Sequence, residues 1–220
     1  MGFLVKLGGK ELKEIKLYLQ IAVENIIEGN VIAFPTNSVY GIGGDPQNLS
    51  VANRIYDIKF RERSKGFLLL ISDIEEALKI AEFNDLGKKL AEQFWPGQLT
   101  LILKKKEPSI IPPEVTGFKS TIGLRIPENE IILNILKLLK EEGYPGIIIG
   151  TSANYSGESP CVSGEQVAKK ILSPIDLIID GGKSKSQLST TIVDCSTAKP
   201  KFIRIGKIPK EEILEFLSNQ

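Results

Sequence analysis

The spacing of apolar residues along the chain predicts a series of amphipathic helices. Between Lys10 and Glu28 the apolar positions recur every three or four residues, which indicates a helix that ends at Gly29. The same periodicity, together with helix start signals such as a capping box at Ser72 and Glu75, predicts six further helices. They lie near residues 48–58, after Ser72, over 84–94, over 129–142, after Ser163 and over about 209–218.

Short apolar runs bounded by turn signals predict buried strands between these helices. The runs lie at residues 31–34, 67–72, 99–104, 121–126, 147–149, 177–180, 191–194 and 202–205. Most are separated by a helix, and the last ones follow one another closely. This order favours an α/β fold in which residues 1–220 form a single domain, with a twisted mixed β-sheet flanked by helices.

Polar residues gather directly after several predicted strands. Pro35 ends the first strand, and Thr36, Asn37, Ser38 and Tyr40 follow it together with three glycines. Hydroxyl, amide or guanidinium groups stand at later strand ends, at Arg125, Ser152, Asn154, Thr190 and Arg204. Each residue alone is compatible with a structural role. Their joint placement favours a site for a small polar substrate, because ligands of open α/β sheets bind at strand ends.

A cluster of cations follows the second predicted helix. Lys59, Arg61, Arg63 and Lys65 lie within seven residues, against the single carboxylate of Glu62. Such a cluster is commonly a solvated end of an element. It is also suited to an anion, because guanidinium and ammonium groups bind phosphate oxygens.

The composition limits the chemistry that the chain can perform. No histidine occurs among the 220 residues, which excludes Ser-His and Cys-His nucleophile pairs and histidine-ligated metal sites. Cys161 and Cys195 are too few for a disulfide scaffold, and we expect both to be reduced and not catalytic. An enzyme of this composition works by positioning and fixed charge, or by carboxylate, lysine, tyrosine or water chemistry.

Charge and hydropathy limit the partners. The net charge is +1, so no overall field draws the chain to nucleic acid or membrane. The longest apolar run, Phe67 to Ile71, is too short to span a bilayer, and the N-terminal residues MGFLVKLGGK lack the plan of a signal peptide. We expect a cytoplasmic protein with no membrane partner.

Seven stretches resemble, in order, the signatures of one known family. PTNSVYGIGG resembles the PTETVYGLG signature of the YrdC-type domain of threonylcarbamoyl-adenylate synthases. KFRERSKG is similar to the Lys-x-Arg element of the family, WPGQLTLIL is similar to its WPGxLTxxL strand, and STIGLRIP is similar to its TxAxRxP strand. TSANYSG is similar to the SANxSG loop of the family, STTIVD is similar to its STVVD stretch, and FIRIGKI is similar to its closing LRxG. The matches run from Val31 to Ile208, which identifies a YrdC-like motif core over residues 31–208 of the short, single-domain form.

The resemblance implies a reaction, its substrates and a set of site residues. L-threonine, bicarbonate and ATP would yield threonylcarbamoyl-AMP and pyrophosphate, which makes the enzyme a nucleotidyltransferase. A downstream tRNA threonylcarbamoyl transferase would then modify adenosine 37, so tRNA itself would bind only weakly or indirectly. Threonine is assigned to Thr36, Arg125, Ser152 and Thr190. ATP is assigned to Lys59, Arg61, Thr121, Asn154 and Arg204, and the cation cluster adds Lys65.

The expected catalytic groups are electrostatic. Lys59 and Arg61 would stabilise charge on the phosphates, Mg²⁺ would arrive with ATP, and no general base is assigned. Three residues depart from the family pattern. Asn37 replaces the glutamate of PTET, Glu62 stands where proline is common, and Asn129 stands where histidine commonly follows the arginine strand.

Two other functions remain open at this point. One is a YrdC-like module that binds RNA without catalysis, against which the net charge of +1 counts. The other is a carbamoyl-adenylate-forming enzyme, against which the chain length counts, because such proteins are much longer.

Overall fold

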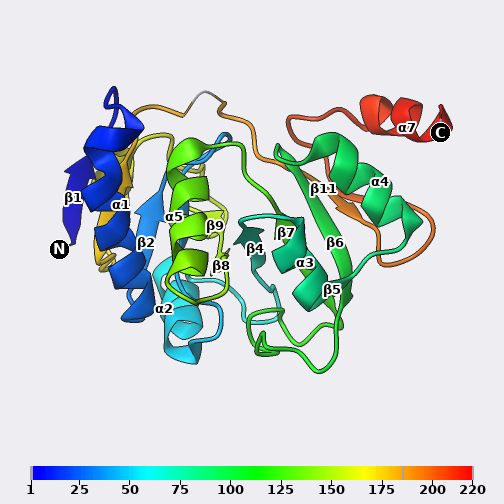
Figure 1. Ribbon diagram of the computed structural model, residues 1–220, viewed down its shortest axis with the longest axis horizontal. Coiled ribbons are helices and arrows are strands. Elements are labelled where there is room, and N and C mark those ends of the chain that lie inside the picture. Colours follow the sequence, from blue (N-terminus) through cyan, green and yellow to red (C-terminus); the bar gives the residue numbers. More distant parts are fainter. Residues whose placement is uncertain (1, 185, 220) are drawn as a thin grey trace.

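The computed structural model describes residues 2–184 and 186–219, and within them it contains seven helices and twelve strands (Figure 1). The helices are α1 (Leu12–Ile27), α2 (Leu49–Lys59), α3 (Ile74–Ile80), α4 (Asp85–Phe94), α5 (Glu130–Glu141), α6 (Gly164–Lys170) and α7 (Lys210–Ser218). The strands are β1 (Phe3–Lys6), β2 (Ile32–Phe34), β3 (Gly41–Gly43), β4 (Leu68–Ile71), β5 (Ala81–Glu82), β6 (Leu99–Lys105), β7 (Thr121–Arg125), β8 (Ile147–Ile149), β9 (Thr151–Ser152), β10 (Leu177–Asp180), β11 (Thr191–Asp194) and β12 (Lys201–Arg204).

The strands form two mixed sheets. Sheet A has the order β1-β10-β2-β3-β9, with parallel pairs at β1, β10 and β2 and antiparallel pairs from β2 to β9. Sheet B has the order β12-β11-β6-β7-β4-β8, with β5 added beside β6. The α/β class with mixed strand pairing is confirmed. The strands nevertheless divide between two sheets, whereas the sequence predicted one.

The division falls at Gly150, which lies between β8 of sheet B and β9 of sheet A. The chain leaves one sheet and enters the other at this residue. The sheets stay joined there, because the Ile149 amide donates to the Gly44 carbonyl at 2.9 Å. Gly43 permits this close approach, since a Cβ atom at Gly43 would lie 1.6 Å from the Ile149 carbonyl oxygen.

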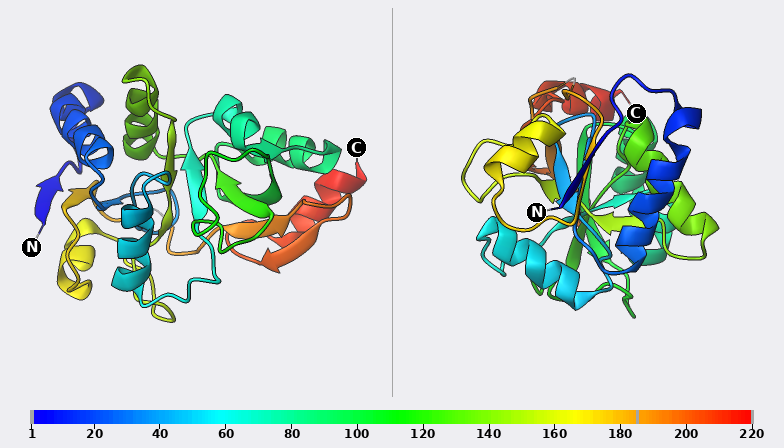
Figure 2. Two further views of the ribbon diagram at one scale, coloured as in Figure 1. Left: turned by 90° about the horizontal axis from the view of Figure 1, so that it is seen from below. Right: turned by 90° about the vertical axis from the view of Figure 1, so that its left-hand side faces the viewer.

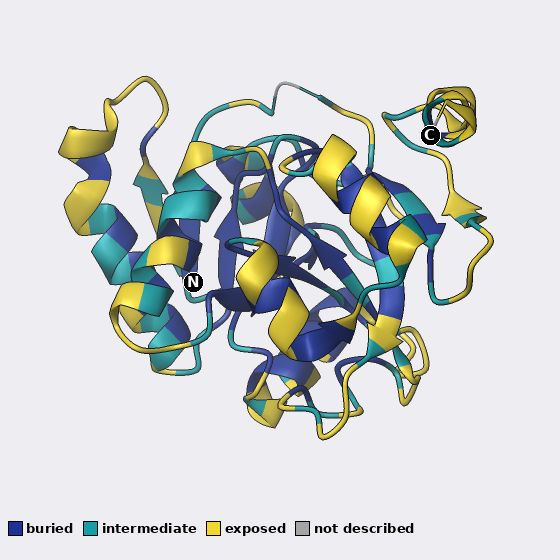
Figure 3. Cartoon of the chain, turned by 45° about the vertical axis from the view of Figure 1, so that its right-hand side comes forward, coloured by how far each residue is buried: buried dark blue, intermediate teal, exposed yellow. Residues whose placement is uncertain are grey.

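Helices cover both faces of sheet A (Figure 2). Ile32 and Phe34 of β2 pack into a cluster with apolar residues of α1 and α5, and Ala33 packs into the cluster that includes residues of α2 and α6. This alternation follows the two-residue period of a strand. Figure 3 shows the result, with buried strands inside and the outward faces of the helices exposed.

The predicted helix starts are confirmed at most positions. Asn84, Asn129 and Ser163 accept hydrogen bonds from the first turns of α4, α5 and α6. The start of α3 was predicted one residue early: Asp73, not Ser72, accepts the bond from the Glu76 amide at 3.0 Å. A carboxylate is the stronger acceptor, and the Ser72 hydroxyl instead donates to Asp73 Oδ2 at 2.7 Å.

The longest helix in the described part of the chain, α1, has 16 residues. Across residues 2–184 and 186–219, none of the helices combines the length and the apolar character that crossing a bilayer requires.

Candidate active site

A cavity of about 240 Å³ is lined by strands of both sheets. Sheet A contributes β2, β3 and β9 with the loop that follows β2, and sheet B contributes β4, β6, β7, β11 and β12. The loop between β6 and β7 adds Thr116 and Lys119 at its border. The polar residues that follow β2 and β8 in the sequence, and those that directly precede β11, therefore meet in one place. Asn154, which the strand-end pattern also included, does not line the cavity.

The cavity face of sheet B follows the two-residue period of its strands. The side chains that share this face are Leu68 and Leu70 of β4, Thr100 and Ile102 of β6, and Thr121, Gly123 and Arg125 of β7. The residues between them, such as Leu101 and Leu124, belong to the hydrophobic core. Strand alternation alone thus decides which polar side chains reach the cavity.

Arg125 is a buried cation held only by neutral groups. Its side chain lies at the end of β7, and the residue is 4% exposed. Nε donates to the Gly97 carbonyl at 2.8 Å, Nη1 to Ser38 Oγ at 3.2 Å, and Nη2 to Asn37 Oδ1. Burial, and secondly the charge of Arg204, lowers the pKa of Arg125 to about 9. A guanidinium in this position is suited to a carboxylate or phosphate ligand.

Thr36 shapes the loop that supports Arg125. Its hydroxyl donates to the Val39 carbonyl at 2.7 Å, lies 2.9 Å from Ser38 Oγ, and accepts from the Ser38 amide at 3.0 Å. The loop is thereby folded so that the Ser38 hydroxyl faces Arg125. Ser152 of β9 lies next to this loop, since it pairs with Gly41.

A second cationic group lies in the same sheet as Arg125, on β12. Arg204 Nε donates to the Thr190 carbonyl and Nη2 to Thr190 Oγ1, both at 3.0 Å. Thr190 Oγ1 also lies 3.0 Å from Thr100 Oγ1. Burial lowers the pKa of Arg204.

Arg61 is the third cation of the cavity. Its Nε and Nη2 donate to the carbonyls of Lys65 and Gly66, both at 2.8 Å. The guanidinium carbon lies 5.5 Å from the centre of the Phe67 ring. These contacts fix the side chain, and burial lowers its pKa.

Seven of the ten residues predicted from the sequence line the cavity, and three do not. The seven are Thr36, Arg61, Thr121, Arg125, Ser152, Thr190 and Arg204. Lys65 is exposed and pairs with Glu62 at 3.1 Å. The Asn154 amide nitrogen donates to the carbonyls of Tyr155 and Glu158.

Lys59 is the third residue that the cavity lining lacks. It is 2% exposed, and its ammonium donates to the carbonyls of Ser152 at 2.5 Å and Asn154 at 2.7 Å. Burial, and secondly Arg61, lowers the pKa of Lys59 to about 7. The Lys59 side chain therefore holds the backbone in place at Ser152 and Asn154 through their carbonyls.

Several cavity residues were not assigned from the sequence. Thr100, Thr116, Lys119 and Ser189 all line the cavity. The position of Thr100 follows from strand alternation once the facing strand is known. Lys119 lies in an irregular loop, where the sequence carries no signal for its direction.

The donor groups of the cavity do not fit a magnesium ion held by the protein. Arginines, one lysine and hydroxyls line it, and none of the described residues in the lining is Asp or Glu. In the described part of the chain, no group of three or more His, Cys, Asp or Glu is placed to hold a metal. Mg²⁺ prefers carboxylate oxygens and phosphates, so this cavity lacks the protein ligands it would need.

Comparisons with known proteins identify relatives of most of the chain. A family model named Sua5_yciO_yrdC, with the description "Telomere recombination", matches residues 24–206. The chain is 34% identical over 196 residues to a threonylcarbamoyl-AMP synthase of Pyrococcus abyssi, covering 89% of this chain and 56% of the relative. It is 34% identical over 212 residues to a putative threonylcarbamoyl-AMP synthase of Methanocaldococcus jannaschii, covering 96% of each.

Solved structures support the same grouping. The crystal structure of P. abyssi Sua5 complexed with L-threonine matches with a TM-score of 0.87 and 31% identity, over 98% of this chain and 61% of that one. The chain thus spans between half and two thirds of the P. abyssi protein. The family model and the relatives together cover most of the chain, and on this basis the chain belongs to the Sua5/YciO/YrdC family.

Proposed function

We propose that the chain is an L-threonylcarbamoyladenylate synthase, a nucleotidyltransferase that forms threonylcarbamoyl-AMP and pyrophosphate from L-threonine, bicarbonate and ATP. One observation carries the proposal. Four cations, Arg61, Lys119, Arg125 and Arg204, line a cavity to which no described residue contributes a carboxylate. Such a cavity is suited to two anionic substrates at once. The names of the relatives and the threonine bound to P. abyssi Sua5 agree with it.

The threonine half of the site is built around Arg125. Its guanidinium would bind the threonine carboxylate, since it is buried and its hydrogen bonds go only to neutral oxygens. Thr36 and Ser152 supply hydroxyls on its side of the cavity, and Thr190 supplies a hydroxyl beside Arg204. Threonine and serine differ by one methyl group, worth about 1 to 3 kcal/mol, so we expect incomplete rejection of serine.

The ATP half of the site lies toward Arg61, Thr121 and Arg204. The two guanidiniums would bind phosphate oxygens, and Mg²⁺ would enter on the phosphates as part of the substrate. Lys59 and Lys65 contribute no atoms to the cavity lining. Lys59 would then act through the Ser152 and Asn154 carbonyls rather than by touching phosphate.

The reaction brings an anion to an anion. The threonine nitrogen reacts with bicarbonate to give a carbamate and water, and a carbamate oxygen attacks the α-phosphorus while pyrophosphate leaves. Cations already fixed by hydrogen bonds lower this repulsion without reorganising during the reaction. The product would pass to a downstream tRNA threonylcarbamoyl transferase.

Pyrophosphate release tests the proposal. The purified chain is assayed with ATP and Mg²⁺, with and without L-threonine and bicarbonate. We expect release only when both are present, and a loss of about 100-fold or more in Arg125→Met and Arg61→Met. Arg63→Met is the matched control, because Arg63 pairs with Asp57 at 3.1 Å and does not line the cavity.

The opposite result is equally informative. Absence of threonine-dependent release, together with salt-sensitive tRNA binding, would contradict the synthase and favour the RNA-binding module.

A further inference from the structure

Thr100 of β6 lies on the strand next to that of Arg125, in the row of sheet B that also holds Arg204. The antiparallel register of β6 and β7 pairs Leu101 with Leu124, and one step further along it sets Thr100 opposite Arg125. On the other side, Thr100 pairs with Ile192 of β11, and Ile192 pairs with Arg204 of β12. A single row across sheet B therefore carries Arg125, Thr100, Ile192 and Arg204 in that order, with Thr100 as its one hydroxyl.

The hydroxyl of Thr100 is buried and has one partner. Thr100 is 1% exposed, Thr190 is 4% exposed, and their oxygens lie 3.0 Å apart. Thr190 Oγ1 also accepts a hydrogen bond from Arg204 Nη2. Among the described residues, neither hydroxyl has another side-chain or backbone acceptor.

A proton count shows what the pair lacks. Two hydroxyls carry two protons, and only one proton can occupy the space between two oxygens. The second O–H is left without an acceptor, although buried donors are nearly always paired. Both residues line the cavity, so the oxygen of a ligand that enters it can supply the missing acceptor. An anionic oxygen is favoured there, because Arg125 and Arg204 stand in the same row of the sheet.

We propose that Thr100, together with Thr190, binds the group derived from bicarbonate in the proposed reaction. The inference rests on the proposed function, which assigns the threonine carboxylate to Arg125 and ATP to Arg204. The bond between the two substrates forms between these two cations. Thr100 and Ile192 are the side chains of the row that lie there, and of these two only Thr100 can donate a hydrogen bond. Its O–H donates to an oxygen of bicarbonate and then of the carbamate.

The step balances without a further reactant. The neutral amine of threonine forms an N–C bond to the bicarbonate carbon, and a C–O bond breaks. The departing hydroxide takes a proton from the nitrogen and leaves as water. A carbamate oxygen then bonds to the α-phosphorus, and the bond from phosphorus to pyrophosphate breaks. Thr100 exchanges no proton in this sequence and is a binding residue.

Thr100→Val tests the proposal, because valine keeps the shape of the side chain and its preference for strands but has no hydroxyl. The readout is pyrophosphate release as a function of each substrate in turn. We expect the apparent KM for bicarbonate to rise about tenfold or more, and the KM for ATP and the Kd for threonine alone to change less than twofold. Thr100→Ser restores a hydroxyl and should restore the bicarbonate KM.

Thr100→Ala is the second variant without a hydroxyl, and it should show the same selective effect even if valine disturbs packing. Melting temperature is measured for all three variants. An unchanged bicarbonate KM in Thr100→Val, or a weaker affinity for threonine in the absence of the other substrates, would overturn this role while leaving the synthase intact. A wild-type chain without threonine-dependent release would overturn both.

Discussion

Among single residues, Lys59 shows the largest difference between the role that its sequence motif suggests and the place that its side chain occupies in the fold. A lysine two residues before an arginine in a cationic segment suggests a phosphate ligand. In the structure the Lys59 ammonium is buried, and it donates to the carbonyls of Ser152 and Asn154. Burial depends on which strand packs over α2, and no local pattern contains that information.

The lowered pKa of Lys59 makes a contribution to stability that depends on pH. The folded pKa is about 7 and the ordinary value is 10.5, so between these values the unfolded chain binds more protons. The free energy of unfolding of the wild type should therefore rise relative to that of Lys59→Met from pH 7 to pH 10. The limit is about 1.4 kcal/mol per pH unit.

Urea denaturation at pH 7, 8 and 9 measures this difference. Lys89→Met is the control, since Lys89 is exposed on α4. A constant gap between the wild type and Lys59→Met over this range would mean that the folded chain keeps Lys59 charged.

Asn37 is a second residue that departs from its motif, and it contacts the guanidinium of Arg125. The resemblance expects glutamate there, which would neutralise a neighbouring cation. In this chain the Asn37 oxygen accepts from Arg125 Nη2, and an amide carries no charge. Arg125 thus keeps its full charge for a ligand, which strengthens the assignment of an anion to this side of the cavity.

At the scale of elements, the junction between the two sheets depends on Gly43. A Cβ atom there would meet the Ile149 carbonyl oxygen at 1.6 Å and its carbon at 2.8 Å, and both are backbone atoms that cannot rotate away. We expect Gly43→Ala to separate β3 from β8 and to lower the free energy of unfolding by about 3 kcal/mol or more.

Gly123→Ala is the matched control for this effect. Its Cβ atom would meet only Leu68 and Thr100, at ordinary contact distances of 3.4 to 3.9 Å. Thermal unfolding followed by circular dichroism compares the two variants. Equal melting temperatures for Gly43→Ala and the wild type would contradict the junction described above.

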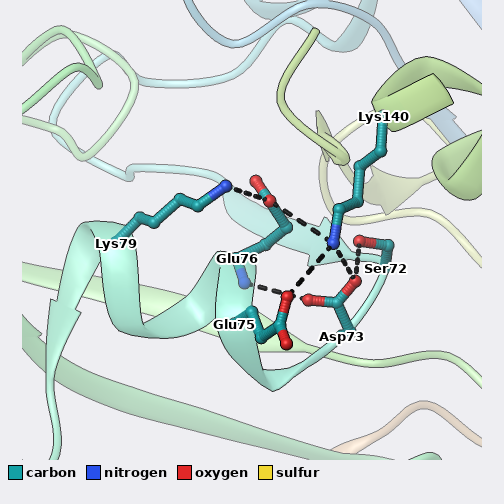
Figure 4. Close-up of polar contacts among 6 residues, drawn as sticks. All are labelled: Ser72, Asp73, Glu75, Glu76, Lys79 and Lys140. Atoms are coloured by element: carbon teal, nitrogen blue, oxygen red, sulfur yellow. Dashed lines mark hydrogen bonds and ion pairs between the residues drawn. The ribbon is translucent and has the colours of Figure 1, made fainter. Parts of the chain in front are cut away.

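A cluster of ionic side chains links α3 to α5 (Figure 4). Lys140 of α5 donates to Asp73 Oδ2 at 2.7 Å and lies 3.7 Å from Glu75 and Glu76. Burial acts to raise the pKa of Asp73, but the hydrogen bonds from Lys140 and Ser72 outweigh it and lower that pKa. The cluster therefore fixes the N-terminus of α3 against α5.

Lys140→Met should lower the free energy of unfolding at pH 7 by about 0.5 to 1 kcal/mol, because the pair is partly exposed and screened by solvent. The contribution of Asp73 is present above its ordinary pKa of 3.8 and is lost as the pH falls through its lower folded value. Urea denaturation at pH 7 and pH 2 should thus show a gap that closes on acidification. Lys137→Met, at an exposed position of the same helix, should show no gap at either pH.

The sequence predicts long elements better than short ones. All seven helices are found, because each has a periodic apolar face or a capping residue. Eight strands are found at the predicted runs. The four that the pattern missed are β1, β3, β5 and β9. Two of these have only two residues, and β3 is Gly-Ile-Gly, so its pairing with β2 and β9 is decided by tertiary contacts.

For the whole molecule, the decisive feature is a cavity shared by two sheets. Ligands that contact both sheets bind the folded chain and not the unfolded one, so they stabilise it. At 100 times their Kd the gain is about 2.7 kcal/mol, which corresponds to a rise in melting temperature of roughly 5 to 10 °C for a chain of this size. We expect this rise with L-threonine in the wild type.

A thermal shift assay measures the effect. Arg125→Met should show no rise with threonine, while Arg63→Met should respond as the wild type does. A threonine-induced rise that survives in Arg125→Met would show that the carboxylate binds elsewhere.

The sequence by itself determined the α/β class, the helices and longer strands, and seven of the residues that line the cavity. These follow from local periodicity and from motifs at strand ends. Only the tertiary structure decided that the strands form two sheets, that Lys59 is buried against the Ser152 and Asn154 carbonyls, and that Thr100 shares a row of sheet B with Arg125 and Arg204. The physical reason is that strand pairing and burial depend on residues far apart in the chain, whereas the side-chain period is local.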